Sequence, residues 1–140
     1  MGVYEFKEGR RLLARVPKGG ELVGHIADLL VEHDVRQGFI SGIGALADAA
    51  LGFYDQQTHE YHEMKLFGGL EIVSLLGNIS LRNGAPHAHL HAGLAGHDGK
   101  VYGGHLARGT VFLTELVIVE FTGHELERVP DESTGLVCWP

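Results

Sequence analysis

The sequence predicts an α+β domain with a mainly antiparallel sheet and one main helix. The chain has 140 residues, of which 44% are hydrophobic and 21% charged, which suits one domain with a real core. Strand-like segments fill most of the chain, whereas a single segment has helical spacing. The 21 glycines are spread throughout, as in turns, bulges and close backbone contacts. We predict one domain over residues 1–140, with its core over 8–130.

The first elements are predicted to be a strand, a tight turn and a helix. Residues 12–16 favour a strand, which the sequence Pro-Lys-Gly-Gly at 17–20 ends. The helix is predicted over residues 21–33, with Glu21 in the first turn and His33 in the last. Its apolar residues recur at helical spacing: Leu22, Ile26, Leu29 and Leu30.

The rest of the chain is β-like. Residues 38–40 lead into a predicted glycine turn at 41–44. Further strands are predicted by apolar, β-branched and aromatic residues between turn signals. They cover residues 49–54, 61–67, 70–79, 87–94, 100–102 and 111–121, with a hairpin loop at 55–59, a last short strand at 125–129 and a weakly specified tail at 131–140.

Three histidines alternate in the sequence Pro-His-Ala-His-Leu-His-Ala at residues 86–92. Side chains on one face of a strand repeat every two residues, so His87, His89 and His91 share a face. Neutral imidazole is the commonest metal ligand and suits Zn, Ni, Cu and Fe. Neighbouring rings of the row lie roughly 7 Å apart, whereas all three span roughly 13 Å, too far for one ion. A third ligand is therefore expected from another segment.

His105 is the best candidate for that ligand. If residues 97–99 form a three-residue loop with Gly99 in the left-handed region, residue 96 pairs with 100 and His91 faces His105. A two-residue Asp-Gly turn would instead move His105 to the other face, unless a bulge at 103–104 restores the register. In the first case His89, His91 and His105 form a three-histidine site with an open position. Glu71 or Glu115 could add a carboxylate or orient a ligand.

Composition narrows the classes of function. The formal net charge of −7 argues against binding of nucleic acid by the whole surface. Cys138 is the only cysteine, which excludes an internal disulfide and a cysteine-based zinc site. The sequence shows neither a signal peptide nor an apolar run near 18 residues, so we expect a cytoplasmic protein without a membrane partner.

The first 18 residues depart from this acidic balance, with a net charge of +3 from five cations against Glu5 and Glu8. The cluster is either a solvated edge strand or a site for an anion or a partner. Its cations are Lys7, Arg10, Arg11, Arg15 and Lys18.

Five segments together resemble the plants-and-prokaryotes-conserved domain, called PPC or PCC, over roughly residues 8–130. They are Ser-Gly-Ile-Gly-Ala-Leu at 41–46, residues 71–80, His89-Leu90-His91, residues 98–101 and Gly-Gly-His-Leu at 103–106. The resemblance implies an α+β fold, a homotrimer and zinc, or another divalent transition metal, on His89, His91 and His105. His87 falls outside the family pattern.

The family also carries a DNA-binding label, from plant proteins in which an AT-hook precedes the domain. The hook core, Arg-Gly-Arg-Pro, is absent here, and a trimer would triple the net charge of −7, so direct DNA binding is not expected. We expect a stand-alone, metal-binding or regulatory module with a possible protein partner. The alternative is a metal-dependent enzyme on a small molecule, with Glu71 as its only candidate base. A cupin is disfavoured, because Ala95 and Gly96 stand where its pattern needs a glutamate.

Overall fold

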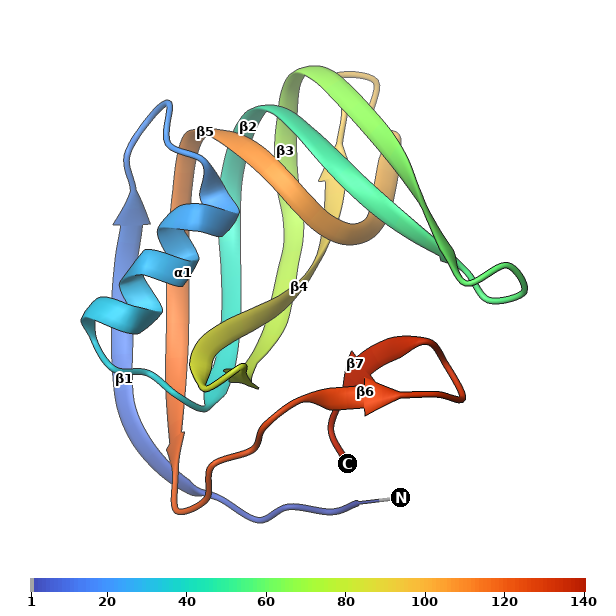
Figure 1. Cartoon of the computed structure of the whole chain (residues 1–140). Coiled ribbons are helices and arrows are strands. Elements are labelled where there is room, and N and C mark those ends of the chain that lie inside the picture. Colours follow the sequence, from blue (N-terminus) through green and yellow to red (C-terminus); the bar gives the residue numbers. More distant parts are fainter. Residues whose placement is uncertain (1) are drawn as a thin grey trace.

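A computed structural model describes residues 2–140 and has one helix and seven strands within that range (Figure 1). In chain order the elements are β1 (Lys7–Val16), α1 (Leu22–Glu32), β2 (Gly38–Asp55), β3 (Glu60–Arg82), β4 (Ala85–Ala95), β5 (Val101–Thr122), β6 (Val129–Asp131) and β7 (Leu136–Cys138). All named strand pairs are antiparallel. The predicted mainly antiparallel α+β fold with one helix is confirmed.

The five long strands form one sheet in the order β1-β5-β2-β3-β4, and β4 also pairs with β5. This extra pairing closes part of the sheet on itself, as the strongly curved ribbons of Figure 1 show. As a result, His105 on β5 pairs with Gly52 of β2 on one side and with His91 of β4 on the other. The closure therefore brings three separate strands together around His105.

Helix α1 covers one face of the sheet, and its apolar side chains complete the hydrophobic core. Leu22, Ile26 and Leu30 are fully buried, as their helical spacing predicts. Glu21 is the N-cap, and its carboxylate accepts hydrogen bonds from the backbone N–H groups of Val23 and Gly24. The same carboxylate accepts a third bond, at 3.1 Å, from the N–H of Gly109 on β5. One side chain thus starts the helix and ties it to the sheet.

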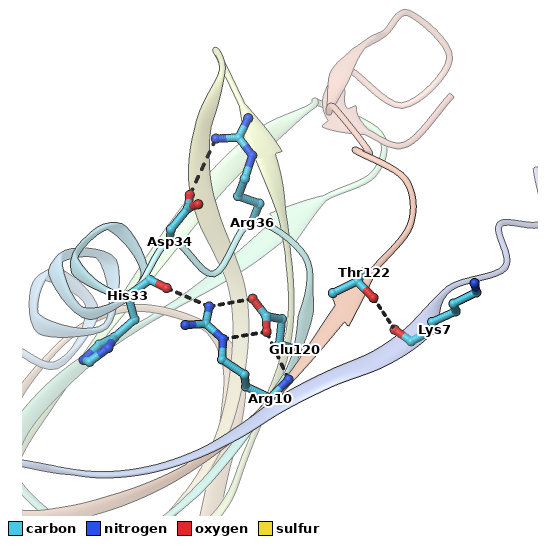
Figure 2. A network of polar contacts seen from close by, with 7 residues as sticks. All are labelled: Lys7, Arg10, His33, Asp34, Arg36, Glu120 and Thr122. Carbon is cyan, nitrogen blue, oxygen red and sulfur yellow. Dashed lines mark hydrogen bonds and ion pairs between the residues drawn. The ribbon is translucent and has the colours of Figure 1, made fainter.

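An ion pair between β1 and β5 lies at the C-terminal end of α1 (Figure 2). Arg10 of β1 donates from Nε and Nη2 to the Glu120 carboxylate on β5, at 2.7 and 2.6 Å. Its Nη2 also donates to the carbonyl oxygen of His33, at the C-cap of α1. The hydrogen bond from Arg10 holds the pKa of Glu120 below its usual value. The contact joins β1, β5 and the end of the helix.

The predicted glycine turn at residues 41–44 is wrong, because β2 runs through it without a break. The register of β2 against β3 shifts between Gly42 and Gly44. Gly44 has a φ of +137°, and a Cβ there would overlap the carbonyl oxygen of Leu113 on β5. Glycine here permits close strand approach and a bulge instead of a chain reversal.

Other predicted strand boundaries also disappear. Residues 61–67 and 70–79 belong to one strand, β3, which continues through Gly68 and Gly69, both with positive φ. Likewise, the strands predicted over 100–102 and 111–121 are one strand, β5, which begins at Val101. Long strands that bend at glycines replace pairs of short predicted ones.

The C-terminal segment is organised by pairing with the sheet. The strand predicted over 125–129 is displaced, since β6 begins at Val129 and pairs with β7. Before it, Leu81 of β3 exchanges backbone hydrogen bonds with Leu126 and Arg128. These bonds carry Arg128 to the sheet.

The sheet face opposite α1 is apolar and open. Directly paired residues share a face, and one such row runs Leu13, Val117, Ser41, Leu76 and His91 across the strands. We call this the outer face. Its large apolar side chains stay exposed, Leu13 at 82% and Ile43 at 61%. Among residues 2–140, no helix is long and apolar enough to cross a membrane.

Candidate metal centre

The alternation of β4 places its histidines away from the core. Leu90 and Ala92 are buried, at 1% and 6% exposure, and pack in the main apolar cluster. His89 and His91 therefore point to the opposite side, with ring centroids 5.2 Å apart. Burial of the small apolar residues fixes the direction of both imidazoles, as the sequence predicts.

The loop after β4 brings His105 to the same place. The N–H of Gly96 donates to the carbonyl oxygen of Lys100 at 3.0 Å, and Gly99 has a φ of +76°. This is the three-residue loop of the first alternative, and it sets His91 directly opposite His105. The predicted register is confirmed.

The three imidazoles form a compact group. The ring centroid of His105 lies 5.2 Å from that of His89 and 5.6 Å from that of His91. Each residue offers one ring nitrogen, and the three nitrogens lie within 4.8 Å of one another. His89 and His105 are half-buried, whereas His91 is exposed. The predicted residues are thus brought together by the fold.

The chemistry of this group suits a transition metal. Nδ1 of His105 is buried and has no hydrogen-bond partner among the described residues, which is unusual for a buried polar atom. Burial, followed by the charge of Arg128, lowers the pKa of His89 to about 4. Burial, followed by the charge of His91, also lowers the pKa of His105. Both rings are therefore neutral at pH 7, the form that binds a metal, and an all-imidazole set suits Zn, Cu, Ni or Fe.

The other candidate ligands lie outside this group. His87 pairs with Ser80 on β3, and burial lowers its pKa. It is not part of the group of three whose ring nitrogens lie within 4.8 Å of one another. Glu71 and Glu115 line two other hollows of the surface. Neither carboxylate reaches the histidines, which removes Glu71 as the candidate base.

A cavity of about 1020 Å³ opens onto the histidines. Its walls come from the hairpin of β2 and β3 around residues 52–63, from β4 and β5, and from the C-terminal hairpin of β6 and β7. The Tyr61 ring lies 5.9 Å from that of His105, and the Tyr54 hydroxyl donates to the carbonyl oxygen of Thr134 at 2.7 Å. These contacts hold the β2–β3 hairpin against β5 and against the β6–β7 hairpin at the site.

Arg128 is a site residue that the sequence reasoning missed. It is buried, and its Nε and Nη2 donate to Ser80 Oγ at 2.9 Å and to Asn78 Oδ1 at 2.5 Å. Those two residues pair with His87 and His89 respectively, so the guanidinium lies beside the histidine strand. Burial lowers the pKa of Arg128. No local motif surrounds this arginine, and only the pairing with Leu81 brings it here.

Fold and site together define a mainly antiparallel α+β domain with a three-histidine centre. The Plants and Prokaryotes Conserved (PCC) domain model matches residues 3–122, and the chain belongs to this family. It is similar to a metal-containing protein from Archaeoglobus fulgidus, with 42% identity and a TM-score of 0.96, covering 100% of this chain and 99% of that one. A plant- and prokaryote-conserved protein from Pyrococcus horikoshii is 37% identical, with a TM-score of 0.95 over 100% and 97% of the two chains.

A curated relative has a different organisation. The bifunctional protein GlmU of Synechococcus sp. (strain JA-3-3Ab) is 31% identical over 124 residues, which are 86% of this chain and 19% of that protein. The chain spans about a fifth of the length of the curated relatives it matches. The domain thus occurs as part of a longer protein as well.

Proposed function

We propose that this chain is a zinc-binding PCC-domain protein that acts as a binding or regulatory module, with His89, His91 and His105 as the ligands. The observation that carries the proposal is the convergence of three ring nitrogens, one from each histidine, within 4.8 Å. The buried Nδ1 of His105, which has no hydrogen-bond partner among the described residues, supports it. The similar protein from Archaeoglobus fulgidus is described as metal-containing, which supports a metal on this chain too. Three protein ligands leave a fourth position for water or a ligand.

Metal analysis tests the site directly. Protein purified without chelator is expected to carry about one zinc per chain, and the double variant His89→Ala/His91→Ala is expected to lose it. His62→Ala/His97→Ala is a matched control, since it removes two exposed histidines outside the group. Equal zinc in both double variants would overturn the assignment.

The proposed module is a homotrimer that buries the outer face. Exposed apolar side chains of β1, β2 and β3 line a hollow of about 720 Å³ on this face, among them Leu13, Ile43 and Val73. An apolar patch of this kind is typical of a protein–protein contact. The patch is continuous with His91 through Leu76, so a second copy seated there would lie beside the metal centre.

Light scattering tests the proposed homotrimer. The expected mass is three times the 15.2 kDa of one chain. Leu13→Glu places a charge on a side chain that is 82% exposed in one chain, so it leaves the fold intact while breaking the assembly. Glu8→Leu serves as a control on the same strand. A wild-type protein of 15.2 kDa mass would contradict the trimer.

DNA is not the ligand that the site favours. Two of the cations near the N-terminus are already paired, Arg10 with Glu120 and Arg11 with Glu8. The net charge of −7 on each chain also repels a phosphate backbone. Titration with duplex DNA at low salt is expected to give no shift in mobility.

The second candidate is a metal-dependent enzyme, favoured by the cavity of about 1020 Å³ in front of the histidines. A zinc ion on three histidines lowers the pKa of a bound water to about 7. A screen of hydrolase and lyase substrates, with and without zinc, tests this function. Turnover that requires both zinc and His105 would support the enzyme over the module.

A further inference from the structure

The cavity in front of the histidines carries positive charge in an otherwise acidic chain. Its charged lining residues are Arg82 and Arg128 against the single carboxylate of Glu63, whereas the whole chain has a net charge of −7. A bound divalent metal would add two further positive charges. Such a cavity concentrates small anions from solution.

Arg128 is the unusual member of this lining. Only 9% of it is exposed, yet no carboxylate pairs with its guanidinium in the described part of the chain. Its hydrogen bonds go to the neutral oxygens of Ser80 and Asn78 and to the carbonyl oxygen of Val137 at 3.3 Å. A buried arginine is normally paired with an acid, because an uncompensated buried charge is costly. The arrangement holds the guanidinium in place and leaves its charge available.

The bonding of Arg128 leaves donors free. A guanidinium has five N–H groups, and three of them are used by these oxygens. The other two belong to the Nη1 and Nη2 atoms, the pair that binds both oxygens of a carboxylate or phosphate. The Trp139 ring lies 5.3 Å from the guanidinium carbon and donates to Ser80 Oγ, which further fixes the plane of the group.

Arg82 extends the same row of side chains. Asn78, Ser80 and Arg82 alternate on β3, so they share the face that is paired with the histidines of β4. Arg82 is exposed and also forms no ion pair within residues 2–140. Two arginines without an ion pair, Arg82 on β3 and Arg128 bonded to β3, thus lie beside the candidate metal centre.

We propose that the cavity binds a small organic anion, whose carboxylate or phosphate oxygens lie between Arg128 and the three-histidine centre. The open metal position would take one oxygen, Arg128 would bind the anionic group through its free N–H donors, and Arg82 would hold a second charge or the far end of the molecule. Tyr54 and Tyr61 supply apolar walls for its carbon skeleton. This inference rests on the proposed metal function for one of its two anchors.

Isothermal titration calorimetry with malonate and, separately, inorganic phosphate tests the anion site on zinc-loaded protein. We expect saturable binding of at least one probe, and the tighter probe identifies the anionic group. Arg128→Lys keeps the charge but removes the planar fork, and is expected to weaken binding about tenfold or more. Arg82→Gln is expected to weaken it a few-fold. Arg11→Gln, which removes an exposed arginine of β1, is the control and should bind as the wild type does.

Zinc content measured on every variant separates this inference from the proposed function. Full zinc loading without saturable binding of either probe, or equal affinities in wild type, Arg128→Lys and Arg82→Gln, would overturn the anion site alone. Absence of zinc from the wild type, together with probe binding that Arg128→Lys weakens, would overturn the metal function and leave the arginine site. Should Arg128→Lys fail to fold, the exposed Arg82→Gln decides the question.

Discussion

The two glycines before His105 have different roles, and this difference gives a sharp test of how the ligand is positioned. A Cβ on Gly104 would lie 2.8 Å from the carbonyl oxygen of Gly52 on β2. A Cβ on Gly103 would meet only the carbonyl oxygen of Ala92, at an ordinary 3.4 Å. Gly104→Ala therefore forces β5 away from β2 next to a metal ligand, whereas Gly103→Ala is a matched control one residue away.

The size of the effect follows from these distances. Relief of the overlap requires the strands to separate by about 0.6 Å, from 2.8 to 3.4 Å. Overpacking of this kind costs about 1–3 kcal/mol of the free energy of unfolding. Metal–ligand distances tolerate about 0.2 Å, so a shift of His105 by a fraction of the separation lowers zinc affinity by about 10–100-fold. Gly103→Ala should change stability by less than about 0.5 kcal/mol.

Urea denaturation of the metal-free proteins and competition with a chromogenic zinc chelator measure the two quantities. We expect stability and zinc affinity to be highest in the wild type, close to that in Gly103→Ala, and lowest in Gly104→Ala. If Gly104→Ala matched Gly103→Ala in both measurements, the close approach of β5 to β2 would not be what positions His105.

Three further predictions concern protons, metal and the helix. Because the pKa of His89 is about 4 in the fold and about 6.5 in the unfolded chain, the unfolded state binds the proton first. The free energy of unfolding of metal-free protein should therefore fall by about 1–3 kcal/mol as pH drops from 6.5 to 4. Urea titrations of His89→Gln should show a shallower fall over the same pH range. Parallel curves for the variant and the wild type would refute this. Zinc at a free concentration 100 times Kd should raise the free energy of unfolding by about 2.7 kcal/mol, so chelation should lower Tm and zinc should restore it. Scanning calorimetry that shows no change in Tm would contradict the site. Glu21→Ala removes three hydrogen bonds to backbone N–H groups and should cost about 1–3 kcal/mol in urea, against little for the exposed Glu32→Ala; equal costs would show that the cap does not tie α1 to β5.

The candidate three-histidine centre could be predicted from the sequence because local features place its residues. Alternation of His89 and His91 with Leu90 fixes which face of β4 carries the imidazoles. The loop ending in Gly99 then fixes the register that brings in His105. Both steps depend on short-range geometry, in which two-residue periodicity and a positive φ leave few alternatives.

The continuity of the strands could not be predicted in the same way. Gly44 satisfies the sequence pattern of a turn, but its role is to admit the backbone of β5. Gly68 and Gly69 likewise bend β3 without ending it. A glycine that reverses the chain and one that permits close approach look alike until the neighbouring strand is known.

Arg128 shows the second limit of sequence reasoning. It follows β5 in the chain and reaches Asn78 and Ser80, 50 and 48 residues earlier, only through the tertiary pairing of its segment with Leu81. Its importance lies in burial without an acidic partner, which is a property of the folded chain alone. The proposed anion site could therefore be inferred only from the folded structure.

Anomalous diffraction at the zinc edge from a zinc-loaded crystal tests the central claim most directly. We expect one strong peak per chain, bound by ring nitrogens of His89, His91 and His105 at about 2.0–2.1 Å, with the fourth position facing the cavity. A peak on any other set of residues, or no peak in crystals grown from zinc-saturated protein, would contradict the three-histidine centre.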